Sequence, residues 1–268
     1  MKAVSRHIYA VTKVVEFWMK GEFLLFLIPY AVIGLIFGYF IYDIDASAAE
    51  SAIKAKEGWF ASIVSGIASS ALSFLSFFLK QITAFLLLTL LSPVASILSE
   101  KLDNRLTGQT FDGGLARIIT DVLRAVGIVI VTLILQLVFM LVWFLISKLL
   151  FFIPGIEVIS SIVYFMIPAF FFGLSFYDFS LERYQFSVGQ SWTYASRNKL
   201  HMVITGGLFS LILMIPIVGL IIAPVFLTMV STIVFLKMNE DVEQPEAATV
   251  ISEKKEQQSE SELKETDE

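Results

Sequence analysis

The sequence predicts an all-α integral membrane protein. It has two long transmembrane helices, two partly re-entrant helical hairpins broken at proline and glycine, and an N-terminal helix in the membrane interface. The first observation behind this prediction is composition: 57% of the 268 residues are hydrophobic, 25 are Phe, and mean hydropathy is +0.80. Only 16% are charged, against about a quarter in soluble domains. The second is a long uncharged run near the C-terminus, and the third is the set of proline and glycine breaks within such runs.

The uncharged run covers Met202 to Leu236, 35 residues. One straight helix of that length would exceed ~50 Å, well beyond a hydrocarbon core of ~30 Å, yet the run is too short for two full spans and a loop. Pro216 and Gly219 interrupt it near the middle. We therefore predict two short helices that enter the membrane and turn back. Broken backbone at membrane depth needs cover from protein or a water-filled cavity, which is typical of channels and transporters.

Three regions follow from apolar content and charge. Residues 1–22 predict an interfacial amphipathic helix, because apolar residues recur there at helical spacing: Val4, Ile8, Val11, Val15 and Trp18. Residues 23–238 predict the helical membrane domain. Residues 239–268 hold eleven acids and three lysines, which predicts a disordered acidic cytoplasmic tail.

The membrane domain begins with two apolar segments. Phe23 to Tyr42 is long enough for one span. Gly58 to Ser99 is apolar for 42 residues except for Lys80, and as one helix it would exceed ~60 Å. It predicts either a long tilted helix that projects beyond the bilayer or a helix broken near Lys80 or Pro93.

Two further apolar segments, 125–147 and 158–177, flank a break at Pro154 and Gly155 and predict the first hairpin. Polar residues 178–201 then predict a short surface helix. Helix N-termini that resume after breaks of this kind attract anions, so Pro154, Gly155, Pro216 and Gly219 are candidates both for turns and for a conduction path.

Basic residues favour the cytoplasmic side, and they gather at the N-terminus, between Lys101 and Arg124, and between Arg183 and Lys199. Both termini are then cytoplasmic. Two spans plus two hairpins that return to the same side satisfy this pattern, and four plain spans plus one re-entrant hairpin satisfy it equally well.

The stretch from Leu91 to Gly108, LSPVASILSEKLDNRLTG, resembles the signature of CysZ-type sulfate permeases and the related etoposide-induced transmembrane proteins. The similarity continues in residues 152–156, 177–179, 196–199 and 214–216, in the family's order and spacing. The residues that carry the motif are Pro93, Glu100, Lys101, Arg105, Gly108 and Asp178.

This resemblance implies two long membrane helices plus two helix pairs that penetrate part of the bilayer. It also implies an oligomeric sulfate channel of the bacterial inner membrane that supplies sulfur for cysteine synthesis without ATP hydrolysis. One departure is present: family members carry arginines after a glycine where the first membrane helix begins, whereas this chain has Lys20-Gly21-Glu22. Glu22 would repel an anion, and a lysine cannot make the paired contact of a guanidinium.

Charged residues inside or beside apolar segments are the candidates for a solute pathway, namely Lys80, Glu100, Arg105, Arg183 and Arg197. Each has a structural alternative. Lys80 could extend its side chain to the far interface, Glu100 and Arg105 could belong to a salt-bridge network at a helix end, and Arg183 and Arg197 could join a second network with Asp178.

Enzyme chemistry has no signature here. The two histidines, His7 and His201, lie near interfaces, and there is no metal spacing, phosphate loop or nucleophile elbow. We therefore expect no enzyme activity, no cofactor and no nucleic-acid partner, but a lipid bilayer, a small anion such as sulfate, and further copies of the chain. The alternative function is a non-transporting scaffold or lipid-organising protein, which the interfacial helix, the hairpins and the acidic tail would suit equally well.

Overall fold

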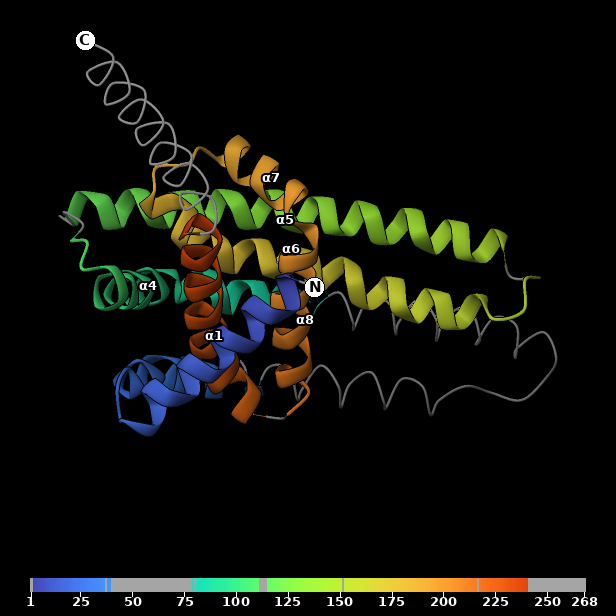
Figure 1. Ribbon diagram of the computed structural model, residues 1–268. Helices are drawn as coiled ribbons and strands as arrows, with labels where there is room; N and C mark the ends of the chain where they lie inside the picture. Colours follow the sequence, from blue (N-terminus) through green and yellow to red (C-terminus); the bar gives the residue numbers. More distant parts are fainter. Residues whose placement is uncertain are drawn as a thin grey trace, which may run out of the picture.

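The long axis of the protein is an antiparallel pair of helices, α5 (Leu115–Leu149) and α6 (Ile156–Arg183), which lie side by side (Figure 1). The computed structural model describes residues 2–36, 38–39, 79, 81–110, 115–150, 152–215 and 217–240. Gly155, with φ 86°, sits in the left-handed region immediately before α6, a conformation that favours glycine. The predicted first hairpin is confirmed, with its turn at Pro154 and Gly155.

A second pair of helices crosses this axis. α8 (Lys199–Leu213) and the helix Val218–Glu240 are separated by a break where the sequence predicts one. At ~1.5 Å per residue α8 is only ~22 Å long, too short to cross a hydrocarbon core. Gly219 allows the two limbs to approach closely, since a Cβ there would lie 2.2 Å from the carbonyl oxygen of Ile212.

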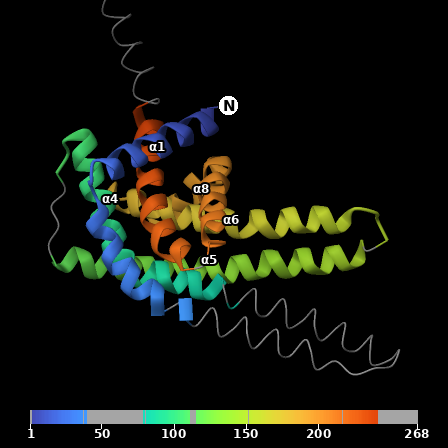
Figure 2. The same ribbon diagram turned by 90° about the horizontal axis from the view of Figure 1, so that it is seen from below.

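The N-terminal region forms α1 (Lys2–Met19), which turns through Gly21 and Phe23 into the short 3-10 helix η1 (Leu24–Phe26) and the rest of Leu24–Ile36. Figure 2 shows this turn, at which the helix axis bends by 94°. The face of α1 that packs on the protein comprises Ala3, His7, Ala10, Val14 and Phe17. The stripe predicted for the membrane interface lies on another face of the helix, where Val4, Ile8 and Val15 are exposed. Small residues at positions 3 and 10 let α1 approach its neighbours closely, which larger side chains would prevent.

The helix broken near Pro93 is the alternative that the structure confirms. Gln81–Leu90 and α4 (Ser92–Thr107) are bent by 61° at Leu91, and Pro93 lies in the first turn of α4, where a missing backbone N–H costs little. Most of the apolar segment before Gln81, Lys80 included, lies outside the described residues, as does most of the acidic tail.

The polar segment after the first hairpin contains the predicted short helix, α7 (Val188–Arg197), whose capping box pairs Ser187 with Gln190. α6, however, does not end at Tyr177 as predicted but continues to Arg183. The helix can continue because its last turns are packed among other helices and because the charged side chains of Asp178 and Arg183 have partners there.

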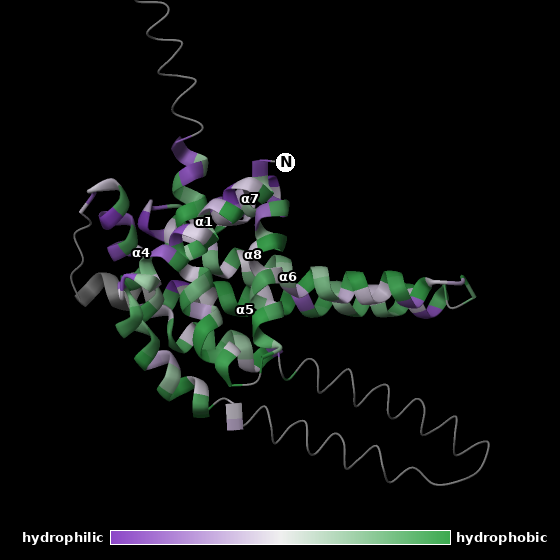
Figure 3. Ribbon diagram, turned by 60° about the horizontal axis from the view of Figure 1, so that its bottom comes forward, coloured by the Kyte–Doolittle hydropathy of each residue, from purple (hydrophilic) through white to green (hydrophobic). Residues whose placement is uncertain are grey.

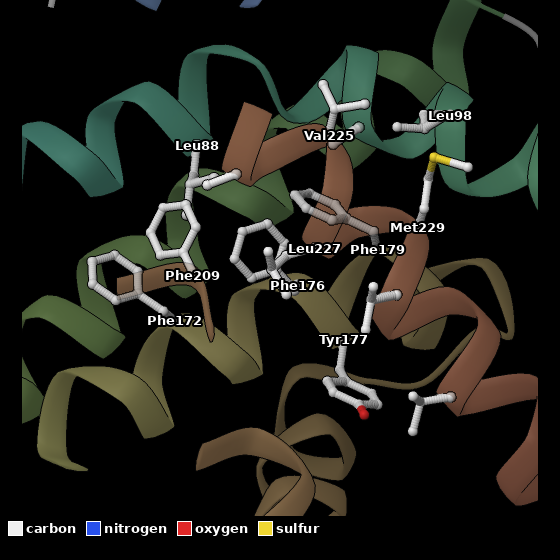
Figure 4. Close-up of a cluster of buried hydrophobic side chains, with 14 of the residues drawn as sticks. Leu88, Leu98, Phe172, Phe176, Tyr177, Phe179, Phe209, Val225, Leu227 and Met229 are labelled. Carbon is white, nitrogen blue, oxygen red and sulfur yellow. The ribbon is translucent and has the colours of Figure 1, made fainter. Parts of the chain in front are cut away.

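The core lies where the last helix crosses the others. Phe172 of α6 stacks on Phe85 at 4.5 Å between ring centroids. Phe172 also meets Phe209 of α8 edge-on at 4.8 Å, beside Phe176 (Figure 4). Of the most apolar part of Val218–Glu240, 78% is buried inside the protein, against 28% for Val126–Leu149 within α5. The last helix is therefore a central element of the fold.

The fold is that of an all-α integral membrane protein. Among the described residues three helices are long and apolar enough to cross a membrane, and up to five spans result if each bent pair counts as one. Figure 3 shows that the α5–α6 pair, which projects from the body, consists largely of apolar residues, while hydrophilic residues gather around α4, α7 and the N-terminal end of α1.

Candidate functional site

A buried ion pair joins α4 to the end of α6. Arg183 donates from Nε to Asp103 Oδ2 at 3.0 Å, and its Nη2 lies 2.9 Å from the same oxygen. Only 2% of the Arg183 side chain and none of the Asp103 side chain is exposed. Asp103 also accepts from Thr107 at 3.0 Å. Charges taken out of water in this way need good geometry and additional hydrogen bonds, and this pair has both.

Hydroxyl groups extend this network into the core. Ser99 accepts from Arg183 Nη1 at 3.0 Å and lies 2.7 Å from the hydroxyl of Thr232 in the last helix. Ser180 lies 3.4 Å from Ser99. Three helices are thus linked by a buried polar cluster made of Ser99, Asp103, Ser180, Arg183 and Thr232.

A second pair links α5 to α6 and α7. Arg124 contacts Asp178 from Nη2 at 2.8 Å and from Nε at 3.4 Å, which approaches the two-point geometry that a guanidinium makes with a carboxylate. Ser191 donates to the same carboxylate at 3.0 Å, and Arg124 also donates to the carbonyl of Phe186. Asp178, predicted as a motif residue, is therefore bound to an arginine that the sequence did not single out.

The third charged contact is open to solvent. Arg105, near the end of α4, places Nε 3.4 Å from Glu22 Oε2, and 62% of the Arg105 side chain is exposed. Lys101 of the same helix lies over the ring of Phe26, 5.5 Å from its centroid. Gly108 ends α4 in the left-handed conformation at φ 75°. Glu22, which the sequence predicts to repel an anion, is thus the carboxylate that meets Arg105.

The other predicted pathway residues are spread out. Glu100 is half-buried on α4, one residue after Ser99, and its negative charge interacts with that of Arg183. Arg197 is exposed at the last position of α7. Lys80 and Pro216 lie outside the described residues. The structure therefore groups Glu100, Arg105 and Arg183 along α4 and its contacts and places Arg197 on a different helix.

Comparison with known proteins decides the family. Residues 10–224 match the family model described as "Sulfate transporter CysZ/Etoposide-induced protein 2.4". The chain belongs to this family. It is also similar to the sulfate transporter CysZ of Pectobacterium atrosepticum, with 28% identity over 136 residues. That similarity covers 50% of this chain and 48% of the relative, so the chain spans about half the length of the curated relative that it matches.

The region that matches the CysZ family contains the charged contacts described above. The family match starts within α1 and ends within the last helix, so it includes Glu22 and all three charged pairs. Among the described residues, no group of three or more His, Asp or Glu could hold a metal ion. What these contacts offer chemically is electrostatic: each guanidinium faces a carboxylate, and that of Arg105 is largely exposed.

Proposed function

We propose that this CysZ-family protein is a membrane permease or channel for sulfate or a similar small oxyanion. It works in the bacterial inner membrane as a homo-oligomer with both termini in the cytoplasm, and it supplies sulfur for cysteine synthesis. The observation that carries the proposal is the family match across residues 10–224. The similarity to a protein named as a sulfate transporter supports the choice of solute.

The charged contacts support a division of roles among the predicted pathway residues. Arg183 is enclosed and bound to Asp103 and Ser99, so it holds helices together. Arg105 is mostly exposed and has a long contact to Glu22. Exposed pairs of this kind contribute only about 0–1 kcal/mol. We therefore assign the first contact with the oxyanion to Arg105, whose planar guanidinium suits a tetrahedral oxyanion.

Liposome uptake of labelled sulfate by the purified protein tests this function. We expect saturable uptake above that of empty liposomes. Arg105→Gln should lower the initial rate by about tenfold or more, because a charge-assisted hydrogen bond contributes about 1.5–3 kcal/mol. Lys80→Ala tests the second candidate cation. Lys13→Gln is the matched control, because Lys13 is a partly exposed lysine on α1 whose partner is Glu16.

No uptake of sulfate, sulfite or thiosulfate by protein with an intact helical fold would overturn the transport proposal. It would leave the scaffold or lipid-organising function. Uptake that persists unchanged in Arg105→Gln would instead move the pathway away from α4 without removing the transport function.

The contact between Glu22 and Arg105 leads to a second prediction, on the affinity for sulfate. Its carboxylate competes with a solute oxyanion for Arg105, so Glu22→Gln should raise the apparent affinity for sulfate by about two- to fivefold, the equivalent of a surface ion pair. Concentration-dependent uptake measures this change. The control is Glu16→Gln, which removes a carboxylate from α1 that pairs with Lys13 and Lys20. An affinity that falls or stays the same in Glu22→Gln would contradict the competition.

A further inference from the structure

A pair of histidines joins the N-terminal half of α1 to the beginning of α8. His7 and His201 are 3% and 8% exposed, and their ring centroids are 5.7 Å apart. His7 Nε2 lies 2.8 Å from Thr205 Oγ1 on α8. His201 Nε2 lies 3.2 Å from Nη1 of Arg6 on α1. Two of the contacts that hold α1 on α8 are therefore made by imidazole nitrogens.

The contact between Arg6 and His201 fixes a protonation state. A guanidinium only donates hydrogen bonds, so His201 Nε2 must accept and can carry no proton there. Protonation of His201 would place an N–H against an N–H and a cation against a cation. The contact at 3.2 Å is compatible only with a neutral His201.

The contacts of His7 differ. Its Nδ1 donates to the carbonyl oxygen of Ala3 at 2.8 Å, and its Nε2 faces a hydroxyl, which can either donate or accept. Thr205 therefore satisfies His7 in both protonation states. Burial also lowers the pKa of His7, but only His201 loses a hydrogen bond to the other helix when it binds a proton.

Neighbouring elements contribute further titratable groups. Tyr177 of α6 and Tyr194 of α7 lie close enough for the charge of Arg6 to act on both phenols. Thr205 is also beside Tyr177. At neutral pH the charged group facing the two imidazoles from α1 is Arg6, and a proton on His201 would add a second positive charge to the same buried cluster.

We propose that Arg6 and His201 form a proton-sensitive latch between α1 and α8. With His201 neutral the latch is closed and the N-terminal half of α1 is docked. When His201 binds a proton the latch opens and this half of α1 leaves α8. Because α1 leads directly into the turn that carries Glu22, the latch couples proton concentration to the segment beside Arg105.

The direction of the pH dependence follows from the surroundings of His201. Burial, then the charges of His7 and Arg6, lower the pKa of His201 from 6.5 to about 4. The undocked state then binds the proton more readily than the docked state. Docking is unaffected above pH 6.5 and weakens as the pH falls toward 4. At pH 5 the equilibrium shifts toward the undocked state by about 30-fold.

Hydrogen exchange measured by mass spectrometry on the full chain tests the latch. Protection factors for amides 4–12 of α1, corrected for the intrinsic effect of pH, should fall by up to about 30-fold between pH 7.5 and pH 5. Peptides from residues 166–176 of α6 serve as the internal reference. In His201→Gln the amide oxygen can still accept from Arg6 but cannot titrate, so protection of α1 should be independent of pH.

Two further variants separate the latch from general loss of structure. Arg6→Gln offers an acceptor to a protonated His201, so the pH response should shrink while the helix stays docked. His7→Gln should keep a pH response, but a smaller one than that of the unmodified chain, because the charge of His7 also lowers the pKa of His201. A pH response that survives in His201→Gln, or constant protection in the unmodified chain from pH 7.5 to pH 5, would overturn the proposal. None of these outcomes depends on which solute is carried.

Discussion

Arg183→Met is expected to destabilise the protein by about 3–5 kcal/mol, because it leaves the Asp103 carboxylate buried without its cation. No part of the Asp103 side chain is exposed, and Arg183 supplies two of the nitrogens around its Oδ2. Ser99 also loses a donor. Unfolding titrations in mixed detergent micelles, followed by circular dichroism, measure the change in free energy.

Two controls separate the burial of a charge from loss of packing. The double variant Asp103→Leu with Arg183→Met removes both charges, and replacing a buried pair by apolar groups is often neutral or stabilising. It should recover most of the loss. Arg105→Met breaks an exposed pair and should cost less than about 1 kcal/mol. Equal losses in Arg183→Met and Arg105→Met would show that the buried pair has no special role.

Gly206→Ala is the second change with a large expected effect. A Cβ at Gly206 would lie 1.8 Å from the carbonyl oxygen of Ala169 and 2.7 Å from the nitrogen of Gly173, both of them backbone atoms of α6. Neither can move away without separating the two helices. Close approach through small residues is a usual way for membrane helices to pack. We expect destabilisation of about 3 kcal/mol or more, at or beyond the upper end of ordinary overpacking.

The neighbouring glycine is the matched control. A Cβ at Gly207 would lie 3.5 Å from the ring of Phe165, an ordinary van der Waals distance. Gly207→Ala should therefore be neutral or slightly stabilising, since alanine is the better helix former by about 1 kcal/mol. The same detergent titrations compare the two variants. If Gly206→Ala is as stable as Gly207→Ala, the α6–α8 crossing is looser than this geometry requires.

Much of the fold follows from apolar lengths and breaks in the sequence. An apolar run that is too long for one helix and too short for two spans requires a turn. The positions of proline and glycine indicate where that turn lies. The breaks at Pro93, at Pro154-Gly155 and before Gly219 are confirmed on this basis. The motif from Leu91 to Gly108 also placed the chain in its family, as the match over residues 10–224 confirms.

The partners of the charged residues needed the tertiary structure. Arg183 meets a carboxylate 80 residues away, and Arg124 meets one 54 residues away. A periodic pattern reports neighbours on one helix, three or four positions apart, and carries no information on contacts between helices. Arg124 was missed for this reason, although it is as firmly bound as the arginine that was predicted.

For the described residues, the sequence by itself determined that the apolar segments are helical and where proline and glycine break them. Only the tertiary structure decided what each helix faces. Leucine and valine are equally suited to lipid and to a protein interior, so hydropathy did not show that Val218–Glu240 lies mostly inside the protein. On α1 the docked face was decided by Ala3 and Ala10, because close approach between helices depends on side-chain size more than on hydrophobicity.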